Sequence, residues 1–139
     1  MVKYLLDSNV IIDYLRGEEN ISRRLKEIQD SEDFLSICSL VYYEVVRGFK
    51  GNTDTNRFRT FLNLCRSWEV LPFDLKATNK SAEIYLQLRN GQTIEDNDIY
   101  IAATAMVNDC VLVTANTNHF GRIKDLNFVN WRTPKNERN

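Results

Sequence analysis

Glycine is scarce in this sequence. The five glycines among 139 residues stand far apart, at positions 17, 48, 51, 91 and 121. With that spacing, neither the GxGxxG fingerprint of dinucleotide-binding folds nor a P-loop occurs. The GxSxG turn that carries the nucleophile of α/β-hydrolases is also absent. These absences argue against a nucleotide cofactor and against serine hydrolase chemistry.

Histidine and cysteine are equally few. The one histidine, His119, cannot supply both the acid and the base of a metal-free ribonuclease, and its polar surroundings predict an exposed loop residue. The three cysteines form no CxxC pair, so a zinc site with four nitrogen or sulfur ligands is excluded. Because Cys38, Cys65 and Cys110 stand among apolar neighbours, we expect buried, reduced thiols.

The chain has no excess of positive charge and no long hydrophobic run. Eighteen Lys and Arg against 19 Asp and Glu give a net charge of −1, so the basic surface typical of nucleic-acid binders is missing. Asp7 and Asp13 interrupt the apolar N-terminus, which argues against a signal peptide. No stretch of about 18 apolar residues suggests a membrane span. We expect a cytoplasmic protein that contacts nucleic acid only locally or through a metal.

The composition, with 43% hydrophobic and 27% charged residues, suits one folded domain. We assign residues 1–132 to that domain and 133–139 to a polar tail. Apolar and β-branched runs predict strands at 2–6, 34–38, 69–73, 111–114 and 127–131. Helical spacing predicts helices at 10–16, 20–29, 40–49, 58–68, 75–90 and 95–108. This alternation predicts an α/β fold, a single-domain three-layer sandwich with a mainly parallel sheet flanked by helices.

Cap residues mark several of these boundaries. Asn20, Ser39 and Asp74 are predicted N-caps, because each precedes an apolar pattern of helical period. Asn90 with Gly91 is expected to close the fifth helix. Residues 116–121 are expected to form a loop.

Carboxylates are the chemistry that remains. Sites in parallel sheets form at the carboxyl ends of the strands. Asp7 follows the first strand directly, and Asn116 comes two residues after the 111–114 strand. Asp98 lies in the first turn of the preceding helix, and Glu44 lies in the helix after 34–38. Helix capping is an alternative role for both Asp7 and Asp98.

Glu44 is harder to explain as a structural residue. Val41 and Val45 flank it on the inward side, and an unpaired buried carboxylate is costly. Its partner is either Arg47, one helical turn away, or a metal ion. Oxygen ligands that repel one another suit a hard divalent cation such as Mg²⁺ or Mn²⁺. Such a cation polarises a phosphodiester and acidifies water, so no histidine base is needed.

Four segments resemble the motifs of PIN-domain nucleases, in particular VapC-type toxins. They are LLDSNVIIDYLRG, SLVYYEVVRG, DIYIAATA and VLVTANTNHFGRI, in the family's order, and they span residues 2 to about 123. The resemblance implies a parallel sheet between helical layers and an acidic site for RNA hydrolysis. It assigns Asp7, Glu44 and Asp98 as catalytic metal ligands for Mg²⁺ or Mn²⁺. The fourth acid of many members is Asn116 here, so a second metal is expected to bind more weakly.

The resemblance also assigns supporting roles and a reaction. Ser8, Asn9, Ser39 and Thr114 correspond to the small polar residues that line such sites. Asp96 does not have the spacing of the third acid and is interpreted as a bystander. In-line attack by water on an RNA phosphate would leave 3′-hydroxyl and 5′-phosphate ends.

The implied partners are RNA, a cognate antitoxin that blocks the acidic site, and a second copy of the chain in a homodimer. RNA contacts would fall to Arg16, Arg47 and Lys50, for which a role as solvated helix residues is the alternative. The chain has more aromatic residues than a small core needs, which gives modest support to a protein partner. They are Tyr42, Tyr43, Phe58, Phe61 and Trp68, and packing in the core is the default role for each.

Two other functions stay open from the sequence. A catalytically weak PIN-like domain that binds RNA or a partner would explain Asn116. A phosphoacceptor signalling domain also places Asp at strand ends, but the matching lysine after the final strand is missing, since that region reads NFVNWRT.

Overall fold

A five-stranded parallel sheet forms the centre of the molecule. The computed structural model describes residues 1–88, 91 and 93–132. The strands are β1 (Lys3–Leu6), β2 (Phe34–Cys38), β3 (Glu69–Leu71), β4 (Val111–Val113) and β5 (Phe128–Val129). Their order is β3-β2-β1-β4-β5, and each described pairing is parallel. The predicted parallel sheet is confirmed.

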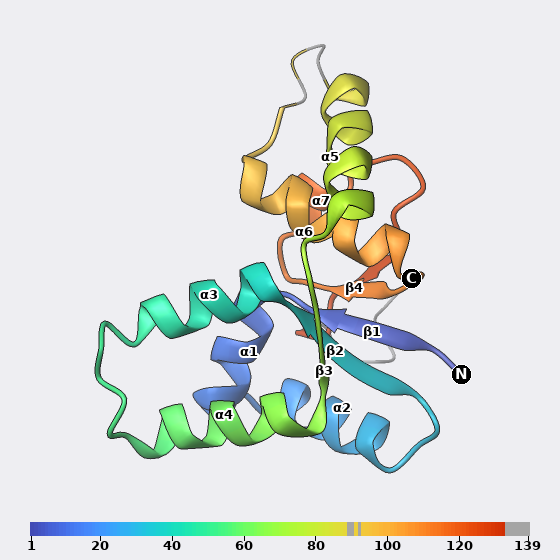
Figure 1. Cartoon of the computed structure of the whole chain (residues 1–139). Helices are drawn as coiled ribbons and strands as arrows, with labels where there is room; N and C mark the ends of the chain where they lie inside the picture. Colours follow the sequence, from blue (N-terminus) through green and yellow to red (C-terminus); the bar gives the residue numbers. More distant parts are fainter. Residues whose placement is uncertain (89–90, 92, 133–139) are drawn as a thin grey trace.

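Helices cover both faces of this sheet. They are α1 (Ser8–Leu15), α2 (Glu19–Gln29), α3 (Ser39–Gly48), α4 (Asn56–Ser67), α5 (Leu75–Gln87), α6 (Asp96–Val107) and α7 (Thr117–Phe120). Figure 1 shows α1, α2 and α4 on one side of the strands, with α5 and α6 packed together on the other. The predicted three-layer α/β arrangement is therefore confirmed.

The core lies between these layers. Leu5 and Leu6 of β1 and Leu112 of β4 are fully buried, and burying each such side chain contributes about 1.5–3 kcal/mol. Trp131 is also buried and packs on Tyr4 of β1, with ring centroids 5.4 Å apart. The end of the described chain is thereby fixed against the sheet.

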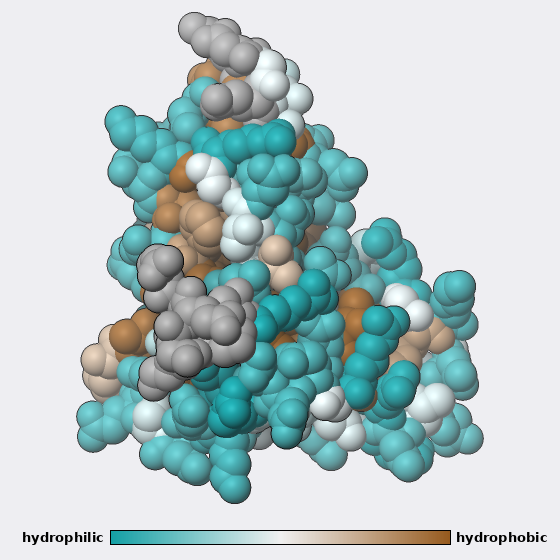
Figure 2. Space-filling model, turned by 180° about the vertical axis from the view of Figure 1, so that it is seen from behind, coloured by the Kyte–Doolittle hydropathy of each residue, from teal (hydrophilic) through white to brown (hydrophobic). Residues whose placement is uncertain are grey.

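Hydrophilic side chains cover much of the face that is turned away in Figure 1. Figure 2 shows this face, on which the hydrophobic side chains form separate patches. Within the described ranges, no helix is both long and apolar enough to cross a membrane.

Two of the predicted N-caps are wrong. The carboxylate of Glu18 caps α2, because it accepts from the backbone N–H groups of Asn20 at 3.1 Å and Ile21 at 2.8 Å. Ser39 is the first residue of α3 rather than its cap, and its Oγ accepts from the N–H of Phe73 at 3.3 Å. The third prediction is confirmed, since Asp74 accepts from the N–H of Ala77 at 3.0 Å.

The strand and loop boundaries differ in places. The predicted strand at 127–131 is reduced to two residues, and the strand at 69–73 ends at Leu71. The expected loop at 116–121 contains the short helix α7. The predicted tail at 133–139 and the helix end at Asn90 fall outside the described residues.

The cysteines and aromatic residues largely follow expectation. All three thiols are free, but Cys65 is only half-buried, whereas Cys38 and Cys110 are buried. Phe61 and Trp68 belong to the core. Tyr43 does not, because 55% of it is exposed.

Candidate active site

The acidic residues gather where the order of the strands reverses. The chain builds outward from β1 to β2 and β3, and then crosses back to place β4 and β5 on the other side of β1. The carboxyl ends of β1 and β4 therefore lie side by side with helices leading away from each, which is the place where ligands bind in open α/β sheets. The N–H of Asp7 donates to the carbonyl of Val113 at 2.9 Å and joins the two strand ends.

Asp7 is the most buried of the predicted acids, with only 4% exposed. One carboxylate oxygen accepts from the Thr114 hydroxyl at 2.8 Å, and the other accepts from the N–H of Ser8 at 2.8 Å. Burial raises the pKa of Asp7, and the negative charge of Asp98 adds to this, while the bonds from Thr114 and Ser8 oppose it. Asp7 is the N-cap of α1 as well, so its two proposed roles do not exclude each other.

Glu44 has an unmet hydrogen-bonding group. Its Oε1 is buried and, among the described residues, has no hydrogen-bond partner. Burial raises the pKa of Glu44, and so do the charges of Asp7 and Asp98, against hydrogen bonds from Ser8 and Asn97. A buried acceptor without a partner costs about 1–3 kcal/mol, so Glu44 lacks a cation or a donor.

Arg47 is not that cation. No ion pair joins Arg47 to Glu44 within the described part of the chain. The Arg47 guanidinium instead lies over the ring of Tyr43, 5.1 Å from its centroid. Within the described residues, Arg47 therefore does not balance the charge of Glu44.

Asp98 contacts the single histidine. His119 Nδ1 lies 3.1 Å from a carboxylate oxygen of Asp98 and 2.9 Å from the side-chain nitrogen of Asn116. The backbone N–H of Asn116 donates to the Thr114 hydroxyl at 3.0 Å, which links this group to Asp7. The prediction that His119 is an exposed loop residue is wrong: it lies in α7 with 38% of its side chain exposed. The spacing of three residues from Asn116 to His119, which one helical turn brings together, is the signal that could have identified it.

The other predicted residues are not all near these acids. Ser8 and Thr114 contact Asp7, whereas Asn9 is exposed on α1. Ser39 bonds to the backbone of Phe73 instead. Asp96 is exposed and lines a separate cavity. Sequence reasoning missed Asn97, whose side chain bonds to Glu44.

The donor set suits a hard divalent cation. No group of three or more His, Cys, Asp or Glu side chains in the described residues is already arranged to hold a metal ion. The charges of Asp7 and Asp98 nevertheless raise the pKa of Glu44, and one oxygen of Glu44 is unmet. A cation with oxygen ligands, Mg²⁺ or Mn²⁺, would relieve both conditions, and zinc would not be expected at such oxygens.

Known proteins share both the sequence pattern and the fold. The family model of the PIN domain matches residues 4–126. Ribonuclease VapC1 of Methanocaldococcus jannaschii is 33% identical over 124 residues, which cover 88% of this chain and 82% of that protein. The crystal structure of VapBC2 from Rickettsia felis, bound to a DNA fragment from its promoter, contains a chain with a TM-score of 0.82 and 26% identity. VapBC-1 from nontypeable Haemophilus influenzae gives a TM-score of 0.81 with 27% identity. These matches cover 94% and 95% of this chain and 99% and 100% of the matched chains.

Proposed function

The chain belongs to the PIN-domain family, with VapC ribonucleases among its relatives, and we propose that it is a Mg²⁺-dependent endoribonuclease and the toxin of a toxin–antitoxin pair. One observation carries the catalytic part of this proposal. One oxygen of Glu44 is buried and has no hydrogen-bond partner among the described residues, and the charges of Asp7 and Asp98 raise the pKa of this carboxyl. Such electrostatic conflict is typical of sites that are completed by a ligand. We assign residues 1–132 to the nuclease domain.

In this proposal Asp7, Glu44 and Asp98 hold the cation, which is Mg²⁺ or Mn²⁺. When bound, the cation supplies positive charge to an RNA phosphate and acidifies a water molecule. Thr114 fixes the carboxylate of Asp7 through its hydroxyl. Asn97 does the same for Glu44. Positioning by such neighbours is worth about 10–100-fold in metal affinity or activity.

The proposed products follow from the nucleophile. Hydrolysis by water does not use the 2′-hydroxyl of RNA, so we expect 3′-hydroxyl and 5′-phosphate ends. The amide of Asn116 brings no charge, so a second cation would bind more weakly than the first. The resemblance also places Asn9 and Ser39 at the site; in the structure Asn9 is exposed, and the hydroxyl of Ser39 accepts from the N–H of Phe73.

A cleavage assay with end analysis tests the enzyme. Labelled RNA should be cut in Mg²⁺ or Mn²⁺ and left intact in EDTA, and Asp98→Asn should remove cleavage while the far-ultraviolet circular dichroism is unchanged. The fragments should be substrates for a 5′-phosphate-dependent exonuclease. Cutting in EDTA, or ends that carry a cyclic phosphate, would contradict the proposal.

The proposed partners are a cognate antitoxin and a second copy of the chain, in the cytoplasm. Support for the antitoxin comes from the similar solved structures of Rickettsia felis and Haemophilus influenzae, which are VapBC complexes. Co-expression with the protein of the neighbouring gene should give a stable complex that no longer cuts RNA, and light scattering of the free chain should give twice the mass of 16.3 kDa. A monomer, or a co-purified neighbour that leaves cleavage unchanged, would contradict this part.

A catalytically weak domain that binds RNA is the second candidate, and Asn116 favours it. The same labelled RNA separates the two functions. Binding without cleavage in Mg²⁺ and Mn²⁺ would favour the second candidate, and restoration of cleavage by Asn116→Asp would show that the missing charge is the reason.

A further inference from the structure

A second cavity lies beside the acidic residues, between α5 and α6. Its volume is about 260 Å³, and its lining includes Phe73, Ala82, Tyr85, Asp96 and Tyr100. The rings of Phe73 and Tyr100 pack on each other with centroids 4.7 Å apart and planes inclined by 45°. Both side chains are only half-buried, so their outer faces are accessible.

The first turn of α6 connects this cavity with the acids. Asp96 lines the cavity, Asn97 bonds to Glu44, and the next residue, Asp98, contacts His119. Asp96 and Asp98 are two residues apart and therefore project from opposite sides of α6, which with its side chains is about 10 Å across. A single strand that passes the acids can therefore place a neighbouring base in the cavity.

A backbone contact fixes the other side of the cavity to the same acids. The N–H of Phe73 donates to the hydroxyl of Ser39, which begins the helix that carries Glu44. Two separate elements therefore hold the aromatic pair in place relative to the acidic residues: the segment after β3, which carries Phe73, and helix α6, which carries Tyr100.

The chemistry of the lining selects a base over a phosphate. Aromatic faces stack on unpaired bases in single-stranded RNA. The carboxylate of Asp96 repels phosphate, and when ionised it only accepts hydrogen bonds. Guanine presents two neighbouring donors, N1–H and the 2-amino group, to such an acceptor, whereas the other three bases place an acceptor beside each donor. Drug-sized ligands occupy about 300 Å³ or more, so a cavity of 260 Å³ is of the size for a single base.

We propose that this cavity binds one unpaired base of the RNA substrate, preferably guanine, next to the scissile phosphate. Tyr100 stacks on the base, the Phe73 ring supports the Tyr100 ring, and Asp96 accepts from the Watson–Crick edge of the base. This inference rests on the proposed ribonuclease function, and it makes Asp96, which the sequence favoured as a bystander, a specificity residue.

Binding in EDTA tests the inference without requiring cleavage. Labelled uridine hexanucleotides, with and without one central guanine, are titrated with the full chain, and fluorescence anisotropy is recorded. The guanine-containing RNA should bind at least about 5-fold more tightly, and Tyr100→Leu should weaken its binding by about 5- to 100-fold, as expected for loss of one base–aromatic stack. Asp96→Asn should leave the stack but abolish the preference for guanine over adenine at the same position.

Phe73→Leu has a matched control in Phe34→Leu. Phe34 is also exposed, at 52%, but lies in β2 at the opposite end of the sheet. Equal loss of binding in both variants, or no preference for guanine in the unmodified chain, would overturn the inference. So would light scattering that shows Tyr100→Leu separating a dimer, because the cavity would then be covered by a second copy. Guanine-selective binding without cleavage in Mg²⁺ would contradict the proposed ribonuclease activity but support the base site. Cleavage without a base preference would support the ribonuclease activity and contradict the base site.

Discussion

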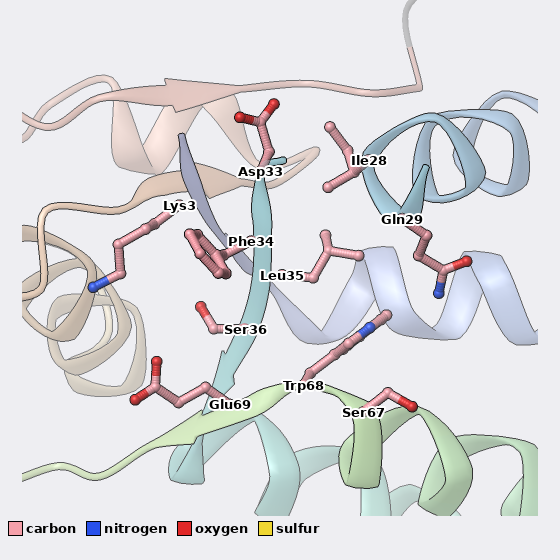
Figure 3. A pocket seen from close by; sticks show the side chains of 10 residues that line it. All are labelled: Lys3, Ile28, Gln29, Asp33, Phe34, Leu35, Ser36, Ser67, Trp68 and Glu69. Atoms are coloured by element: carbon pink, nitrogen blue, oxygen red, sulfur yellow. The ribbon is translucent and has the colours of Figure 1, made fainter. Parts of the chain in front are cut away.

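The two ends of the same sheet both carry carboxylates, yet only at the carboxyl end do neighbouring acids raise the pKa of one of them. At the amino end a cavity of about 270 Å³ is lined by Lys3, Asp33, Trp68 and Glu69, among others. Figure 3 shows Lys3 and Glu69 on one side of β2 and Trp68 on the other. There Asp33 accepts from the N–H of Val2 at 2.8 Å, and a lysine accompanies the two acids.

At the carboxyl end the carboxylates act on one another. Asp7 and Asp98 each raise the pKa of Glu44, and no ion pair to Glu44 or Asp7 exists in the described ranges. The Asp98 carboxylate has only a half-exposed histidine beside it. The difference shows that carboxylates alone do not mark a site: at the amino end Glu69 is exposed and Asp33 accepts a backbone N–H, whereas at the carboxyl end the charges of two acids raise the pKa of a third.

The largest expected effect comes from changing one acid at each end. Asp7→Asn should lower the rate of RNA cleavage by more than about 100-fold. The loss of a proposed metal ligand should reduce activity at least as much as the loss of a residue that orients such a ligand, which costs about 10–100-fold. Asp33→Asn makes the same change at the amino end and should leave the rate within about 2-fold. Substitutions at the surface, away from a functional site, change stability by about 0.5 kcal/mol or less, so the variant should remain folded and active. Initial rates on labelled RNA in Mg²⁺ provide the comparison.

The fold of both variants should be retained. Asparagine is as good an N-cap as aspartate, so Asp7→Asn keeps the start of α1. Thermal unfolding in EDTA serves as the control. Comparable activity in Asp7→Asn and Asp33→Asn would remove the functional difference between the two ends.

A buried hydroxyl at each end gives the next comparison. Thr114→Val deletes the donor to Asp7 without changing side-chain shape and should lower activity by about 10–100-fold. Ser36→Ala deletes a hydroxyl that donates to the carbonyl of Tyr4 at 2.8 Å and should cost about 1 kcal/mol of stability without altering the cleavage rate. Steady-state kinetics and urea unfolding of both variants check this. A large loss of activity in Ser36→Ala would show that the rate reports stability rather than the site.

The pH dependence of stability isolates the conflict at the carboxyl end. The pKa of Glu44 is raised from 4.5, so the folded state binds more protons than the unfolded state once the pH exceeds about 4.5. The contribution of Glu44 to the free energy of unfolding is therefore present at low pH and is lost as the pH rises through the raised pKa. Glu44→Gln removes the titration, so in EDTA the variant should gain about 1 kcal/mol over the unmodified chain at pH 8 and little at pH 4.

Urea unfolding across that pH range measures the difference between the two proteins. Glu69→Gln at the amino end is the matched control for replacing a glutamate by glutamine. A difference for Glu44→Gln that stays constant with pH would contradict a raised pKa of Glu44. Mg²⁺ should reverse the order of stability at pH 8, because only the unmodified chain offers the full set of carboxylates.

The layers of the fold were predictable from the sequence because each depends on a local pattern. The continuous run at 111–114 and the helical period in α6 belong to an alternation of strands and helices, and this alternation predicted a parallel sheet covered by helices. Cap residues were less predictable. Glu18 could not be identified as the cap of α2, because the reach of a carboxylate to two N–H groups depends on its rotamer and not on its residue type alone.

The acids of the candidate site follow from chemistry and family resemblance, but their neighbours do not. The contact between Asp98 and His119 joins residues 21 positions apart, and no periodicity in the sequence reports such a contact. That Arg47 does not pair with Glu44 also needed the three-dimensional structure, because Arg47 turns toward Tyr43. Helical spacing alone allowed either orientation.

The smallest effect is expected at Trp68, the amino end's own unmet group. Its indole N–H is buried and has no partner among the described residues, in a cavity that also contains charged side chains. Trp68→Phe removes this donor along with part of the ring. The variant no longer has the cost of a buried N–H without a partner, but it also buries less apolar surface, and the two effects on the free energy of unfolding should cancel to within about 0.5 kcal/mol. Urea unfolding should therefore give nearly equal midpoints, with unchanged cleavage of RNA. An unmet neutral donor, unlike an unmet carboxylate among other carboxylates, does not by itself require a ligand. A loss of RNA cleavage in Trp68→Phe would therefore mean that the amino end also takes part in function.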